Sequence, residues 1–175
     1  MKECALNTRR VLAHSHWWSF GWSEWTDIWE TPNYQGCGVY KIRLADAEGF
    51  PVEVPRFIDT DKDGILQICY SENIKKGIYR FLRATEGKRY PNAEGERLQL
   101  LKKYTNLKKR YNDCKMQYSF KKQASGKEAR MEREKLLKCY VKKYAEVPPI
   151  KKNFPDKYID WESVPDPDTP TLIQF

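Results

Sequence analysis

Histidine is almost absent from this sequence, and cysteine does not occur in closely spaced pairs. The only histidines are His14 and His16, and the five cysteines are scattered along 175 residues without a CxxC pair. Structural zinc sites need closely spaced thiolate and imidazole ligands, and disulfide frameworks are built from an even set of cysteines. The sequence therefore predicts neither a zinc site nor a disulfide framework, and reduced thiols in a cytoplasmic protein fit it best.

Long apolar runs are absent as well. No stretch approaches the roughly 18 consecutive apolar residues that a membrane-spanning helix needs. The N-terminal region has no apolar run of the kind found in signal peptides. We therefore expect a cytoplasmic location and no membrane partner.

Positive charge and aromatic side chains are abundant instead. The chain has 32 lysines and arginines against 24 aspartates and glutamates, a formal net charge of +8, and 14% aromatic residues. A basic balance favours polyanionic partners such as nucleic acid, an acidic protein or an anionic membrane surface. The length predicts one domain with arms. We expect a Trp-rich N-terminal arm over residues 1–35, a domain over 36–150 and a Pro-rich C-terminal tail over 151–175.

Three segments have the residue pattern of β-strands. Residues 38–44 and 114–120 alternate between apolar and polar side chains, and 65–69 is an apolar run of strand length. Between the predicted strands at 38–44 and 65–69, residues 50–58 contain two prolines, which favours an irregular or edge strand.

Three helices are expected after the second strand. Ser71 can cap the first helix, whose apolar positions fall on one face. A second helix is predicted over 93–110. The pair Ser125 and Glu128 has the spacing of a capping box, which predicts a third helix ending near residue 144. Strands and helices in this order predict an α+β fold with a small central antiparallel β-sheet flanked by helices.

Tryptophans dominate the N-terminal arm. Their steps of four, three and four residues correspond to one face of a helix, so a helix or turn that packs its aromatic side chains onto the domain is expected. These residues are Trp18, Trp22, Trp25 and Trp29.

An aspartate-rich stretch, Asp59-x-Asp61-x-Asp63-Gly64, matches the opening of a calcium-binding EF-hand loop. Such a loop closes with a bidentate glutamate at its twelfth position, but this position is Tyr70. The residues before the stretch are strand-like and contain prolines. A polar turn between strands explains the same residues and is the prediction.

Gly38-Val39-Tyr40 opens a set of motifs that follow one another in order. Gln67-Ile68-Cys69 ends the second predicted strand, and Glu134 lies on the last predicted helix, before the turn at Pro148-Pro149. The ordered set resembles the GIY-YIG nuclease superfamily over about residues 36–150. Gly38-Val39-Tyr40 stands at the place of the first motif and Gln67-Ile68-Cys69 at the place of the second.

The resemblance implies hydrolysis of a DNA phosphodiester with Mg²⁺ or Mn²⁺ when the site is active. It implies that Tyr40 activates a water molecule and that Glu134, or Glu132 two residues earlier, holds the metal. The tyrosine of the second motif falls on Gln67, which cannot act as an acid or base, and the helix arginine falls on Gly77. Because the transition state needs a cation beside its developing negative charge, catalysis is expected to be impaired unless neighbouring cations replace the arginine. The candidates for that replacement are Lys76 and Arg80.

Other cations are expected to contact the nucleic-acid backbone. Contacts of lysine and arginine with phosphates supply affinity that is independent of sequence and weakens with salt. The expected contacts are Lys41, Arg43 and Arg56 on the strands, and Lys102, Lys103, Lys108 and Lys109 on the second helix.

The sequence thus predicts a protein that binds nucleic acid, DNA in the first place, on an endonuclease-like fold with an impaired active site. Two alternatives stay open. One is an active metal-dependent endonuclease with a rearranged site. The other is a protein-interaction or inhibitor module that binds a protein partner through the arm and the tail.

Overall fold

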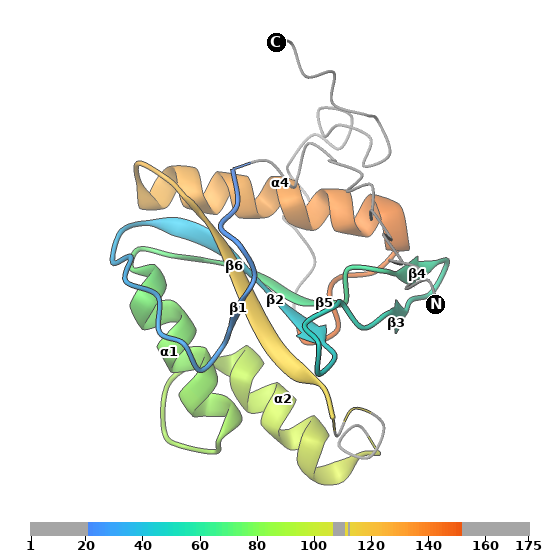
Figure 1. The fold of residues 1–175 in the computed structure, drawn as a ribbon. Helices are drawn as coiled ribbons and strands as arrows, with labels where there is room; N and C mark the ends of the chain where they lie inside the picture. Colours follow the sequence, from blue (N-terminus) through green and yellow to red (C-terminus); the bar gives the residue numbers. More distant parts are fainter. Residues whose placement is uncertain (1–20, 107–110, 112, 152–175) are drawn as a thin grey trace, which may run out of the picture.

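The computed structural model describes residues 21–106, 111 and 113–151 of the protein. A four-stranded antiparallel sheet has the strand order β1-β6-β2-β5, and a small two-stranded hairpin, β3-β4, lies beside it (Figure 1). The predicted α+β fold, a small antiparallel sheet flanked by helices, is confirmed. The strands are β1 (Thr26–Asp27), β2 (Gly38–Ala45), β3 (Val54–Pro55), β4 (Thr60–Asp61), β5 (Ile65–Ser71) and β6 (Lys115–Lys122), and the helices are α1 (Ile74–Thr85), α2 (Ala93–Tyr104) and α4 (Gly126–Tyr144).

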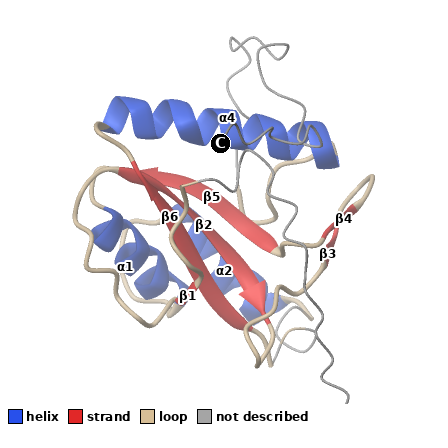
Figure 2. Cartoon of the chain, turned by 45° about the horizontal axis from the view of Figure 1, so that its top comes forward, coloured by secondary structure: helices blue, strands red, loops and turns tan. Residues whose placement is uncertain are grey.

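Helices cover both faces of the sheet, which explains why β2 is buried along most of its length (Figure 2). Successive side chains of a strand point to opposite faces. Tyr40 and Ile42 belong to one apolar cluster, with Phe81 of α1 and other residues of α1 and α2. Val39 belongs to a second cluster, with Leu136 and other residues of α4. The sheet therefore separates the side chains that meet α1 and α2 from those that meet α4.

The N-caps explain where the helices begin. The Oδ1 of Asn73 accepts a hydrogen bond from the backbone N–H of Lys76, so Asn73 caps α1 and the predicted cap at Ser71 is wrong. Ser71 ends β5, and its hydroxyl oxygen accepts a hydrogen bond from the N–H of Asn73. The predicted cap of the last helix is confirmed, because the Oγ of Ser125 accepts a hydrogen bond from the N–H of Glu128.

The segment before β2 closes the N-terminal end of α1. The N–H groups of Ile74 and Lys75 donate hydrogen bonds to the carbonyls of Gly36 and Tyr34. The N–H of Lys76 donates to the side chain of Asn73, and the N–H of Asn73 itself donates to the hydroxyl oxygen of Ser71. The four N–H groups that a helix usually leaves without partners are thus all satisfied, and this helix end offers no donor to a bound phosphate.

The aspartate-rich stretch forms the predicted polar turn, at the end of β4. The carboxylate of Asp61 is fully buried and accepts hydrogen bonds from the N–H groups of Asp63 (2.9 Å) and Ile65 (3.0 Å) and from the hydroxyl of Tyr140 (2.8 Å). Burial raises the pKa of Asp61, and the hydrogen bond from Tyr140 opposes that rise. Asp61 therefore joins the hairpin to α4.

The described part of the Trp-rich arm lies along β6 as the short strand β1 and its flanking turns. Of the expected helix or turn, residues 21–36 form turns and the short strand and no helix, and the expected packing is confirmed for Trp22 and Trp25, which contact the cluster beneath α4. Trp29 is exposed. Trp18 lies outside the described residues.

Of the predicted tail, only residue 151 is among the described residues. None of the helices described is long and apolar enough to cross a membrane.

Candidate nucleic-acid interface

Tyr40, the tyrosine of the first motif, points into the core between β2 and the helices α1 and α2. Its side chain is 2% exposed. Burial raises the pKa of Tyr40 well above its ordinary value, and Cys69, with which it shares a hydrogen bond, adds to the rise. A tyrosine that accepts a proton from water needs a lowered pKa. This environment keeps the Tyr40 phenol protonated at neutral pH, as a hydrogen-bond donor.

Gly77 lies on α1 beside Ser71 and Tyr40. A Cβ atom at this position would lie 2.9 Å from the side chain of Ser71 and 3.3 Å from Cε1 of Tyr40. Real Cβ atoms keep a larger distance from such neighbours, so a larger residue requires the helix or the strand to shift. The resemblance assigns an arginine to this helix position. The position is tightly packed, however, and glycine fits there without a shift of the helix or the strand.

Gln67, at the place of the second-motif tyrosine, is fully buried on β5. Neither the Nε2 nor the Oε1 of its amide has a hydrogen-bond partner among the described residues. Burying an amide without a partner costs free energy, and the amide carries no proton-transfer chemistry. The structure places Gln67 in the sheet as a polar group within the core.

The acids expected to hold a metal lie on α4, and Tyr40 lies on the opposite face of the sheet. The carboxylate of Glu132 forms an ion pair with Lys121 at 2.7 Å. Glu134 forms an ion pair with Arg133. Among the residues that the structure describes, no three side chains of His, Cys, Asp or Glu gather as metal ligands would. The structure thus does not bring Tyr40 together with Glu132 or Glu134.

Three of the cations expected at the nucleic-acid surface are buried instead, and that expectation is wrong for them. Lys41 and Arg43 are 7% and 8% exposed, and they lie against the rings of Trp22 and Trp25, with 4.0 Å from the Lys41 Nζ to the Trp22 centroid. The Arg56 side chain pairs with Glu146 and donates a hydrogen bond to the carbonyl of Val147. These side chains are buried because α4, its C-terminal end and the Trp-rich arm cover them. The three side chains are packed within the fold and do not face solvent.

Burial of Lys41 makes stability depend on pH. Burial lowers the pKa of Lys41 to about 8, below the roughly 10.4 of an unfolded chain. The folded state therefore disfavours the ammonium, and its stability relative to a Lys41→Met variant should rise as pH increases from about 8 to 10. The tryptophan faces favour the ammonium, so we expect a gain of about 2 kcal/mol.

Urea unfolding of both proteins at about pH 7 and about pH 10 measures this difference. Lys127→Met makes the same chemical change on the exposed face of α4 and serves as the control. An equal response of the Lys41→Met protein and the wild type to pH would contradict the assignment.

The two cations expected to replace the missing arginine, Lys76 and Arg80, lie on the outer surface of α1. The inner face of the helix is apolar and buried. The outward positions span an arc of roughly 140°. Every one of them from 75 to 83 is a cation or a tyrosine, and the helix itself contains no acid. They are Lys75, Lys76, Tyr79, Arg80 and Arg83.

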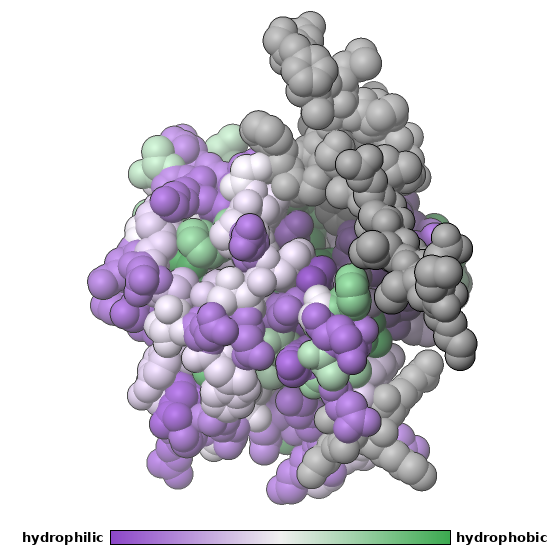
Figure 3. Space-filling model, in the orientation of Figure 1, coloured by the Kyte–Doolittle hydropathy of each residue, from purple (hydrophilic) through white to green (hydrophobic). Residues whose placement is uncertain are grey.

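The loop after α1 extends this surface. The ring of Tyr90 meets the ring of Tyr79 edge to face at 5.5 Å. Glu86 pairs with Arg83 at 2.9 Å and with Lys88 at 3.0 Å. Hydrophilic side chains are prominent at the lower left of Figure 3, where Figure 1 places α1. We call this surface the α1 basic face and define it as Lys75, Lys76, Tyr79, Arg80, Arg83, Lys88, Arg89 and Tyr90.

Compared with protein-family models, with curated proteins and with solved structures, the chain gave no match. The resemblance to the GIY-YIG superfamily therefore stays a prediction from the motifs. A signal for the α1 basic face was present in the sequence, because Lys75-Lys76 and Tyr79-Arg80 recur at a spacing of four residues. Of these residues, the resemblance gives a role only to Lys76 and Arg80, as substitutes for an arginine.

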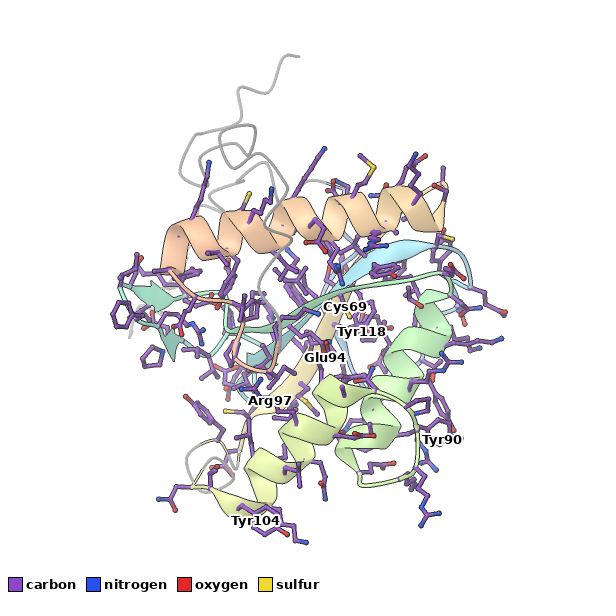
Figure 4. All side chains as sticks on the ribbon, turned by 180° about the vertical axis from the view of Figure 1, so that it is seen from behind. Cys69, Tyr90, Glu94, Arg97, Tyr104 and Tyr118 are labelled. Carbon is purple, nitrogen blue, oxygen red and sulfur yellow. The ribbon has the colours of Figure 1, made fainter. Side chains whose placement is uncertain are left out.

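The cations expected on the second helix lie elsewhere. Lys102 and Lys103 are exposed near the C-terminal end of α2, and the Nζ of Lys103 lies 4.9 Å from the ring centroid of Tyr104. Figure 4 shows Tyr104 and Tyr90 at opposite sides of the α1–α2 pair. Lys102 also lines a cavity of about 400 Å³ whose other walls are mainly apolar. Lys108 and Lys109 lie outside the described residues.

Proposed function

We propose that this protein binds nucleic acid through the α1 basic face, on a GIY-YIG-like fold whose cleavage site is impaired. The observation that carries the proposal is the composition of that face: six cations and two tyrosines, with one acid, Glu86, among them. A row of cations on one helix face suits the regularly spaced phosphates of a nucleic acid.

Three cations of the face are available to a ligand. Lys76, Arg80 and Arg89 are exposed, and none has an ion pair within the part of the chain that the structure describes. Binding a phosphate therefore breaks no existing ion pair at these positions. Such contacts release counterions from the nucleic acid, so affinity should fall steeply as salt rises.

Impaired cleavage is supported by the environment of each motif residue. Tyr40 keeps its proton, Gly77 fills the place of the arginine, and Gln67 lacks acid–base chemistry. Losing one preorganised charge-stabilising donor typically costs a rate factor of about 10² to 10³. Binding through α1 needs none of these groups.

Charge reversal on α1 tests the proposal. The Lys76→Glu, Arg80→Glu, Arg89→Glu variant should bind a labelled DNA on the order of a hundredfold more weakly at moderate salt, because three phosphate contacts become repulsive. The slope of log K against log salt should become shallower by about 2 to 3. Fluorescence anisotropy across a salt series measures both quantities.

The matched control reverses Lys127, Arg130 and Lys135, three exposed cations of α4 on the other side of the sheet. It changes the net charge equally and should weaken binding far less. Equal losses in the two variants would show that net charge alone, rather than α1, governs binding, and undetectable binding by the wild type would overturn the proposal.

Incubation with plasmid DNA and Mg²⁺ or Mn²⁺ tests the impaired site separately. We expect intact plasmid. Cutting that both Tyr40→Phe and Glu134→Ala abolish would establish the active endonuclease instead, and would leave the binding surface as proposed.

A further inference from the structure

We infer that the α1 basic face prefers single-stranded nucleic acid, with Tyr79 and Tyr90 as a stacking platform for unpaired bases. The inference rests on the proposed function and adds the structural class of the ligand. It is carried by two tyrosines that meet each other at the surface, within a ring of cations.

The two tyrosine rings lie at the surface, although aromatic rings are usually covered by other residues. Tyr79 is 41% exposed, and Tyr90 is half-buried against it. The Cζ of Arg83 lies 5.8 Å from the centroid of the Tyr79 ring. In Figure 4, Tyr90 lies on the outer side of α1, away from Cys69 and Glu94 near the centre of the molecule. The pair therefore contributes its surface to a ligand rather than to the core.

Aromatic rings beside cations bind single strands through two complementary contacts. The cations follow the phosphates, and the rings stack on base faces without regard to sequence. A duplex hides its base faces inside the helical stack, so only an unpaired base can reach a tyrosine ring. The phosphate contacts serve both forms of nucleic acid, whereas the tyrosines favour the single strand.

A groove continues the platform toward the segment before β2. It has a volume of about 310 Å³, and Tyr79, Lys75 and Lys76 form one wall. On the other wall, the hydroxyl of Thr31 and the amide of Gln35 are exposed and make no hydrogen bond to any residue that the structure describes. These groups can donate to and accept from the edge of an unpaired base. The groove thus gives a neighbouring nucleotide a hollow beside the stacked base, with two polar side chains in its wall.

The test compares a labelled oligothymidylate of about 20 nucleotides with a duplex of the same length. The wild type should bind the single strand at least about tenfold more tightly than the duplex. Tyr79→Ala and Tyr90→Ala should each weaken single-strand binding by roughly 5- to 150-fold, and leave duplex binding within about twofold. Tyr79→Phe keeps the ring and should bind like the wild type.

Tyr104→Ala is the matched control, because Tyr104 is also an exposed tyrosine but lies on α2. Its single-strand affinity should not change. Thermal unfolding of each variant shows whether the fold persists. Equal or tighter binding to duplex, or an unchanged Tyr79→Ala protein, would overturn the single-strand inference while the proposed function stands. Failure to bind either nucleic acid would overturn the proposed function itself.

Discussion

Replacing Asp61 by alanine is expected to lower the free energy of unfolding by about 3 to 5 kcal/mol. The change leaves the hydroxyl of Tyr140 and the N–H of Ile65 buried without an acceptor, and each orphaned donor costs about 1 to 3 kcal/mol. It also removes a link between the β3-β4 hairpin and α4, since Asp61 belongs to β4 and accepts the hydrogen bond from Tyr140 of α4. Urea unfolding monitored by tryptophan fluorescence gives the value.

Two further variants separate the causes of that loss. Tyr140→Phe removes the hydrogen bond from the Tyr140 hydroxyl to Asp61 and should cost about 1.5 to 3 kcal/mol, because the acceptor is charged. Asp63→Ala removes an exposed carboxylate from the same turn. This carboxylate favours the charged forms of Lys41 and Arg43, so its loss should cost at most about 1 kcal/mol. Losses as large at Asp63 as at Asp61, or an increase in stability on adding calcium, would favour a cation site over the polar turn.

Introducing arginine at Gly77 is expected to destabilise the fold by about 3 kcal/mol and to restore no nuclease activity. Overpacking a fitted contact costs about 1 to 3 kcal/mol per site, and the added Cβ meets both Ser71 and Tyr40. The better helix propensity of arginine returns about 1 kcal/mol at most. Thermal unfolding and the plasmid assay measure the two outcomes.

Lys76→Arg provides the comparison for Gly77→Arg, because it places an arginine on an exposed position of the same helix. Its stability should equal that of the wild type. Combining Ser71→Gly with Gly77→Ala should recover part of the cost of Gly77→Ala alone, since the 2.9 Å contact is with the side chain of Ser71. A stable Gly77→Arg protein that cuts DNA would show that the lost arginine alone had impaired the site.

Most of the sheet and the helices could be predicted from the local pattern. The alternation in residues 38–44 and 114–120 located β2 and β6, and Ser125 marked the start of α4. Ser71 is a plausible cap by residue type, but Asn73 forms the N-cap because its side chain accepts the hydrogen bond from the N–H of Lys76. The arm was predicted as a helix or turn from its tryptophan spacing, whereas pairing with β6 drew residues 26 and 27 into a strand.

The candidate site was harder to predict, because burial of a charge depends on what covers it. Lys41 and Arg43 have the residue types and strand positions of a phosphate-binding surface. They are covered by Trp22 and Trp25, which come from a segment about 20 residues earlier in the chain. No local pattern reports such a contact. The outward-facing residues of α1 follow from helical spacing alone, so this part of the α1 basic face could be predicted from the sequence.

Although β1 is short, it covers an edge of the sheet. Strand edges with unpaired N–H and C=O groups invite pairing with another chain. Residues 23–28 cover this edge of β6 with backbone hydrogen bonds, from the N–H of Ser23 to Phe120 and from that of Ile28 to Met116. A shortened chain that begins at Gly36 would lose this cover and expose an aggregation-prone border.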